Sequence, residues 1–153
     1  MFHRRRHDRR SPAGMKPAMR RGSASIECVL IFPVLLTLTI GTIDVCSAMF
    51  LKESAVLAAY EGARQGVGRG YSNQDVVNRI QEFLDERNIQ YETSDITISS
   101  PGFGAATTLQ PVTVTVAIPA AGNLLMPSEV IGNLRMDGSV TMVKEYENLE
   151  NGS

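Results

Sequence analysis

The sequence has little of the side-chain chemistry that most enzymes use. Its only histidines are His3 and His7, its only cysteines are Cys28 and Cys46, and neither residue type occurs after position 46. Histidine is the commonest general base and metal ligand, and cysteine is the usual thiol nucleophile. The remaining carboxylates are typical of a solvated helix face. We therefore expect no enzyme activity, no cofactor and no metal site.

Basic residues are concentrated at the start of the chain. Residues 1–22 contain eight Lys or Arg and one acid, whereas the remainder contains seven basic and fifteen acidic residues. An excess of positive charge before an apolar helix predicts that the N-terminus stays in the cytoplasm and that the acidic remainder is exported. The arginine cluster lacks interleaved aromatic residues and a folded domain, so nucleic-acid binding is disfavoured. We expect a disordered basic leader over residues 1–22.

One apolar run is long enough to cross a bilayer. Sixteen uncharged residues separate Glu27 from Asp44, and the apolar character continues to Leu51. At about 1.5 Å per residue, a helix over residues 23–51 spans the roughly 30 Å of hydrocarbon, and Pro33 predicts a mild kink. Cys28 and Cys46 would lie roughly 27 Å apart on one face and could not form a disulfide within one chain.

The anomaly of this segment is Glu27, an acid at the entrance to the apolar run. An ionised carboxylate at the centre of a membrane helix costs roughly 2.5 to 3.5 kcal/mol, and somewhat less near an end, so Glu27 requires a partner. If the chain were cut between Gly22 and Ser23, Glu27 would be the fifth residue of the product, about one helical turn from the new α-amino group. This spacing suggests such an amino group as the partner of Glu27.

Residues 52–70 predict an extension of the helix followed by a Gly-rich break. Its alanines favour helix, and Glu61 and Arg64 have the i,i+3 spacing of an ion pair. Gly62 would permit close approach of another backbone. Two interpretations of Glu61 and Arg64 remain open, a solvated helix face or a contact with another subunit. Asp44 is similarly either a water-facing acid or a subunit contact.

Residues 71–145 predict a small exported α+β module. Ser72 is a candidate N-cap, and the apolar residues from Val76 to Leu84 recur with the period of an amphipathic helix that Asn88 could close. Alternating apolar residues then predict three antiparallel strands, around residues 95–99, 112–118 and 139–144. One face of this sheet would be covered by the amphipathic helix.

Two further expectations concern the C-terminal part of the module. Asp137-Gly138 predicts either a tight turn or a bulge before the last strand. Residues 146–153 form an acidic tail that we expect to fray.

Four short motifs, in order, resemble one known family. They are Gly22 with Glu27, Ile43-Asp44-Val45, Ala58-Ala59-Tyr60-Glu61-Gly62-Ala63-Arg64 and Thr141-Met142-Val143-Lys144-Glu145. Together they resemble the pattern of TadE-like pseudopilins of the tight-adherence (Tad) pilus system, which is part of the type IV pilin superfamily. Cys28 departs from the pattern, because a bulky apolar residue often follows the glutamate.

The resemblance implies a minor pilin-like subunit that a prepilin peptidase cuts after Gly22. It implies that Glu27 pairs with a subunit's new amino terminus during assembly, and that the partners are other pilins or pseudopilins, the Tad assembly platform and membrane lipid. The protein would cross the bacterial inner membrane once, with its module in the periplasm or at the cell surface. The alternatives are an uncleaved single-span anchor carrying a binding module, and a soluble domain released by signal cleavage near Met49.

Overall fold

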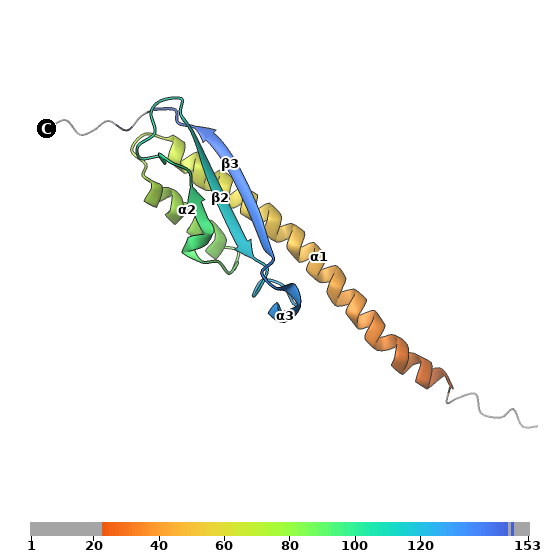
Figure 1. The fold of residues 1–153 in the computed structure, drawn as a ribbon. Helices are drawn as coiled ribbons and strands as arrows, with labels where there is room; N and C mark the ends of the chain where they lie inside the picture. Colours follow the sequence, from red (N-terminus) through yellow and green to blue (C-terminus); the bar gives the residue numbers. More distant parts are fainter. Residues whose placement is uncertain (1–22, 147, 149–153) are drawn as a thin grey trace, which may run out of the picture. The chain divides into compact units, whose positions relative to one another are not determined.

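A computed structural model describes residues 23–146 and 148, so the predicted leader (1–22) and most of the predicted tail lie outside the described residues. The elements follow one another in the order α1 (Ser23–Val67), α2 (Asn73–Asp85), the 3-10 turn η1 (Thr93–Asp95), β1 (Ile96–Ile98), β2 (Pro111–Pro119), α3 (Ser128–Ile131) and β3 (Arg135–Val143). Figure 1 shows this order along the chain. The fold is α+β, as the sequence predicts.

The first helix, α1, continues through Pro33 and ends at Val67, directly before Gly68. It is long and apolar enough to cross a membrane, and the apolar stretch that would do so has no buried residues. The predicted transmembrane helix with its extension is therefore confirmed as one continuous element. Contacts divide the chain into two units, Met1–Leu36 and Thr37–Ser153, and the α+β module belongs to the second.

Helix α2 begins and ends where local chemistry directs. The Ser72 hydroxyl accepts a hydrogen bond from the Asp75 backbone N–H, and the Asp75 carboxylate accepts one from the Ser72 N–H, which makes a complete capping box. At the other end, Asn88 adopts a left-handed conformation with φ of 53°. Both predicted helix boundaries are thus confirmed.

The three strands form one antiparallel sheet in the order β1-β2-β3. Successive residues of β2 alternate between buried and half-buried positions, and Val112, Val114, Val116 and Ile118 are the buried ones. The other face carries hydroxyl groups, and the Thr113 Oγ1 lies 2.8 Å from the Thr141 Oγ1 of β3. The alternation of apolar and polar residues therefore predicts correctly which face of the sheet is buried.

The prediction for Asp137-Gly138 is wrong. Both residues lie inside β3, which begins at Arg135, and they pair with Ala117 and Val116 of β2. A Cβ atom on Gly138 would lie 2.3 Å from the Val56 backbone nitrogen of α1. The glycine is therefore needed for close approach between a strand and a helix, and not for a turn.

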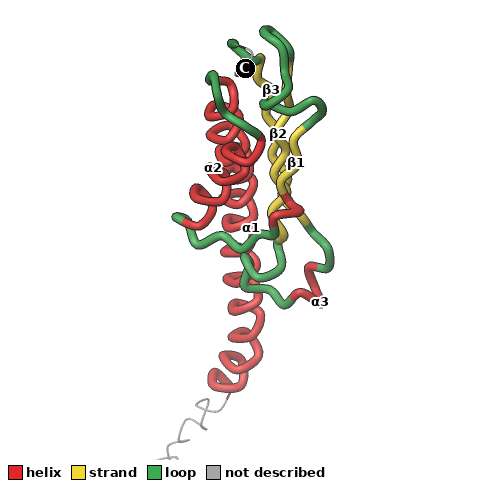
Figure 2. The backbone as a smooth tube through the Cα atoms, turned by 90° about the vertical axis from the view of Figure 1, so that its left-hand side faces the viewer, coloured by secondary structure: helices red, strands yellow, loops and turns green. Residues whose placement is uncertain are grey.

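The core lies between the sheet and two helices on one of its faces (Figure 2). The buried face of α1 consists mostly of small residues at helical spacing, among them Ala55, Ala58, Ala59 and Ala63. Such residues bring the α1 backbone close to the sheet and to α2. The sequence predicted only α2 as the covering helix, so the contribution of α1 to the core is a finding of the structure.

Candidate functional site

The predicted processing region lies at the start of α1. Gly22 is outside the described residues, and Ser23 is the first residue of the helix. Glu27 is exposed and, in the part of the chain that the structure describes, has no hydrogen-bond or ion-pair partner. It lines a shallow hollow of about 320 Å³ whose other lining residues are Cys28, Ile31, Phe32 and Leu35. A carboxylate with these apolar neighbours can form an ion pair with a positively charged group.

The second predicted residue, Asp44, is held inside the chain. Its side chain is only 5 % exposed, and its two oxygens accept hydrogen bonds from the backbone N–H groups of Leu125 (2.9 Å) and Met126 (2.8 Å). Two N–H donors on one carboxylate are charge-assisted hydrogen bonds, which compensate its burial. Neither sequence interpretation of Asp44 included this contact. A signal existed, because Asp44 falls on the same helical stripe as the buried Leu51 and Ala55.

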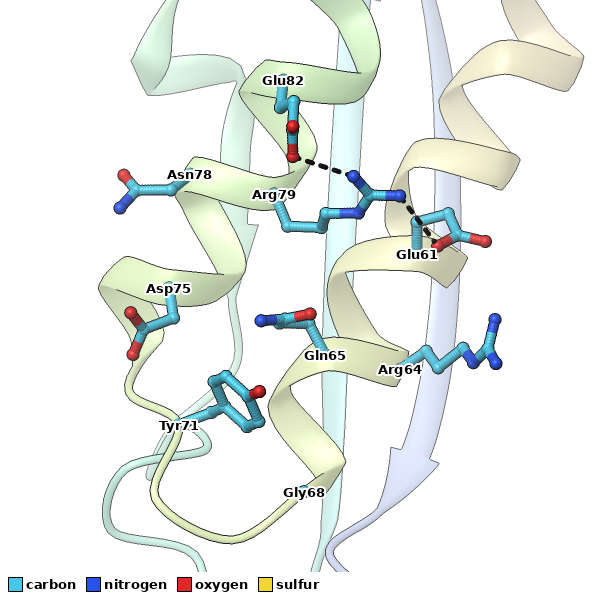
Figure 3. Close-up of a pocket in the computed structure, with 9 residues that line it drawn as sticks. All are labelled: Glu61, Arg64, Gln65, Gly68, Tyr71, Asp75, Asn78, Arg79 and Glu82. Atoms are coloured by element: carbon cyan, nitrogen blue, oxygen red, sulfur yellow. Dashed lines mark hydrogen bonds and ion pairs between the residues drawn. The ribbon is translucent and has the colours of Figure 1, made fainter.

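The third predicted pair, Glu61 and Arg64, is separated by the fold. Glu61 faces α2, where the Arg79 guanidinium lies 3.5 Å from its carboxylate and 2.8 Å from that of Glu82 (Figure 3). Arg64 is exposed and extends away from α2 in the same view. The expected i,i+3 pair is therefore replaced by a pair between helices, because a partner on α2 faces Glu61 directly.

A groove runs along this junction of α1 and α2. Its volume is about 750 Å³, and it is lined by Glu61, Arg64, Gln65, Gly68, Tyr71, Asp75, Asn78, Arg79 and Glu82. Most of these groups are polar or charged, and the hydrogen bond to Glu82 raises the pKa of the Arg79 guanidinium. Among the described residues, no three His, Cys, Asp or Glu side chains come together as a metal site requires.

The glycine of the Glu-Gly-Ala-Arg motif allows close approach, but the neighbouring group is a side chain and not the backbone that the sequence predicts. A Cβ atom on Gly62 would lie 2.5 Å from the Ile80 side chain of α2, and one on Gly66 would lie 2.5 Å from the Phe103 ring. These two glycines, one helical turn apart, accommodate two core side chains. The motif therefore has a structural role in packing α2 against α1.

The fourth motif contains a residue that sequence reasoning missed. Lys144 is fully buried, and its ammonium donates hydrogen bonds to the backbone oxygens of Gly66 (2.8 Å) and Gly68 (2.7 Å) at the end of α1. Burial lowers the pKa of this lysine. The cation satisfies carbonyls that have no partner within the helix and lies at the negative end of its dipole. The strand period gives the signal, since Lys144 follows Val140 and Met142 on the inward face.

A second missed pair fixes the other end of the sheet. Asp95, in η1, is buried and forms an ion pair with Arg135 at the start of β3. Arg135 also donates to the Ala117 carbonyl oxygen of β2, at 2.7 Å. Nothing in the local sequence around either residue identifies its partner 40 residues away.

These features define a class of protein, an α+β module that continues from one helix able to span a membrane. Residues 22–64 match the family model described as TadE-like protein. The match confirms the resemblance to TadE-like proteins of the Tad pilus over the first three motifs, while the fourth lies beyond it. No curated protein and no solved structure matches the chain.

Proposed function

We propose that this chain is a minor pilin-like subunit of a Tad-type adhesive pilus, cut after Gly22 by a prepilin peptidase. The new amino terminus at Ser23 would then pair with Glu27 of a neighbouring subunit during assembly. The role is structural and not enzymatic. The observation that carries the proposal is the TadE-like match, which begins at Gly22 and includes Glu27.

The electrostatics of α1 support this proposal. A cleaved chain would begin with a positive amino group at a helix N-terminus, where the helix dipole is also positive. That arrangement is unfavourable in an apolar environment unless a carboxylate lies nearby. Glu27 is exposed on the same helix, so it can reach an amine of a neighbouring chain or, before assembly, the amine of its own chain. Pairing offsets part of the cost of burying both charges.

The same proposal assigns the surface of the module to subunit contacts. Arg64 is exposed beside the polar groove and makes no ion pair within the described chain, so it is available to an acid on another subunit. Glu61 and Asp44 are already bonded within the chain. If they contribute to assembly, they do so by fixing the positions of α2 and of the loop around Leu125.

Processing is tested by mass spectrometry of the protein extracted from the membrane. A mature chain that starts at Ser23 supports the proposal. An intact leader instead indicates the uncleaved single-span anchor, and a start near Met49 indicates ordinary signal cleavage. Gly22→Val serves as the control, because blocking the cleavage site should restore the full-length mass.

Assembly is tested with Glu27→Ala in cells that make the pilus. We expect cleavage to continue and pili to be lost or greatly reduced, because the amine of the neighbouring subunit then has no counter-charge. Glu53→Ala is the matched control, since Glu53 is also an exposed acid on α1. Normal pili in the Glu27 variant would contradict the proposed pairing.

A further inference from the structure

The loop between β2 and β3 is apolar and is fixed in place at its base. Asn123 donates to the Gln90 and Pro119 carbonyl oxygens (both 2.9 Å) and accepts from the Gln90 N–H (2.8 Å). Asp44 holds Leu125 and Met126 through their backbone N–H groups. The loop therefore has a defined position beside α1.

Large apolar side chains of this loop are nevertheless exposed. Leu125 is 65 % exposed and Val130 is 68 % exposed, and Leu134 is also exposed. Glu129 is the only charged residue among residues 120–134. Figure 1 shows α3, which carries Val130, at the end of the sheet where the chain passes from β2 to β3. A fixed, nearly uncharged loop that displays such side chains marks an interaction surface.

The position of the loop along α1 identifies what covers this surface. One hydrogen-bonded contact joins the loop to Asp44, directly after the sixteen uncharged residues that end at Ile43. Another contact joins Lys52 to the Asp137 carbonyl oxygen, at the start of β3. Asp44 and Lys52 are about 12 Å apart along a helix, and residues 127–134 connect the two contacts in sequence. With α1 across the bilayer, Asp44 lies at the margin of the hydrocarbon, where an interfacial region of about 5 to 7 Å begins.

The same stretch of α1 is apolar on its outer side. Val45, Met49 and Phe50 are exposed, and with Met136 of β3 they line a mostly apolar groove of about 750 Å³. Two charged residues, Lys52 and Glu53, also belong to its lining. The helix and the loop thus present apolar side chains at one level, directly after the apolar run. The Asp44 carboxylate lies on the same stretch of α1, and both of its oxygens accept hydrogen bonds from backbone N–H groups of the loop.

We propose that the loop of residues 121–134 is seated in the lipid interface and that Asp44 holds it there. The apolar side chains enter the boundary between headgroups and acyl chains. The two backbone N–H groups of the loop keep the Asp44 carboxylate hydrogen-bonded in that environment. The module then meets the membrane at two points, α1 and the loop, so its orientation is fixed. This inference depends on α1 being a membrane helix and does not depend on cleavage at Gly22.

The test uses the full chain in phosphatidylcholine vesicles at low protein density. Cys28 and Cys46 are replaced by alanine, and one cysteine is introduced as Leu125→Cys or Val130→Cys and labelled with an environment-sensitive fluorophore. Leu109→Cys is the matched control, because Leu109 is 75 % exposed and its N–H is bonded to the Lys144 carbonyl oxygen, near the opposite end of β3. Nitroxide-labelled lipid then reports contact with the bilayer.

We expect nitroxide lipid to remove most of the emission at positions 125 and 130, with a blue shift on incorporation into vesicles, and to leave the emission at position 109 unchanged. No quenching at 125 and 130 would overturn the proposal. Shielding of these positions only at high protein density would also overturn it, because a second chain would then be the occupant. Equal quenching at all three positions would overturn it as well, since the loop would have no specific contact.

Discussion

The ammonium of Lys144 lies 2.8 Å from the carbonyl oxygen of Gly66, and this contact joins the end of the last strand to the end of the first helix. The residues are 78 positions apart in the sequence. A buried cation at a helix C-terminus satisfies carbonyls that have no partner within the helix. The stability of the module therefore depends on the Lys144 side chain. The sequence pattern shows this residue only as the end of a strand.

Replacing this lysine should destabilise the module. Lys144→Met removes the donor from the buried contact to Gly66 and from the part-buried contact to Gly68, so we expect a loss of about 2 to 3 kcal/mol of unfolding free energy. Lys52→Met is the matched control, since Lys52 is exposed and donates to a single carbonyl; its effect should stay within about 1 kcal/mol. Pulse proteolysis of the full chain in detergent micelles, across a urea series, measures both. Equal effects of the two changes would contradict the assigned role.

Adding a methyl group at Gly138 should be more damaging than its size suggests. Gly138→Ala would bring a Cβ atom to 2.3 Å from the backbone nitrogen of Val56, and backbone cannot move aside as a flexible side chain can. We expect a loss of about 3 kcal/mol or more, at the upper end of overpacking effects. Gly104→Ala is the control, because its nearest neighbour would lie 4.0 Å away. If the two variants unfold at the same urea concentration, the proposed close approach is excluded.

Weakening the hydrogen bonds between Asp44 and the loop should allow the loop to open locally. Asp44→Asn replaces one acceptor oxygen by a donor, so one of the two backbone N–H groups loses its partner. A loss of about 1.4 to 3 kcal/mol corresponds to roughly a tenfold to hundredfold faster hydrogen exchange at Leu125 and Met126. Asp137→Asn, at an exposed acid, should leave these rates unchanged. Unchanged exchange in the Asp44 variant would show that the hydrogen bonds do not hold the loop.

The capping box of α2 predicts a pH dependence. The backbone N–H of Ser72, followed by its hydroxyl, lowers the pKa of Asp75 below the usual 3.8. A carboxylate with a lowered pKa stabilises the folded chain above pH 3.8, and this stabilisation is lost as the pH falls through the folded-state pKa. Wild type should therefore melt above Asp75→Asn at pH 7, and the difference should vanish well below pH 3.8. Melting temperatures in nonionic detergent that keep a constant difference would refute this.

Removing the exposed guanidinium of Arg64 should separate folding from assembly. Arg64→Ala should change the unfolding free energy by no more than about 0.5 kcal/mol, because the side chain is exposed and makes no ion pair in the described chain. If Arg64 contacts another subunit, the number of pili per cell should fall. Arg69→Ala, at a neighbouring exposed arginine, provides the comparison. Equal pilus counts in both variants would remove Arg64 from the proposed contact.

The sequence by itself determined the elements of this protein. The apolar run and alanines of α1, the capping residues Ser72 and Asp75, and the alternation in β2 depend on neighbours within a few positions. Such local preferences operate before the chain folds. The same holds for the TadE-like motifs, which are short and lie in one order along the chain.

The tertiary structure decided which charged groups are satisfied and by whom. Asp44 is bonded to a loop 81 positions away, Glu61 to Arg79 in place of Arg64, and Lys144 to the end of α1. The place of Gly138 inside a strand likewise depends on how closely α1 lies against the sheet. These outcomes follow from long-range packing, because a buried charge takes the partner that the fold brings within hydrogen-bond distance. Spacing along the chain gives no measure of that distance.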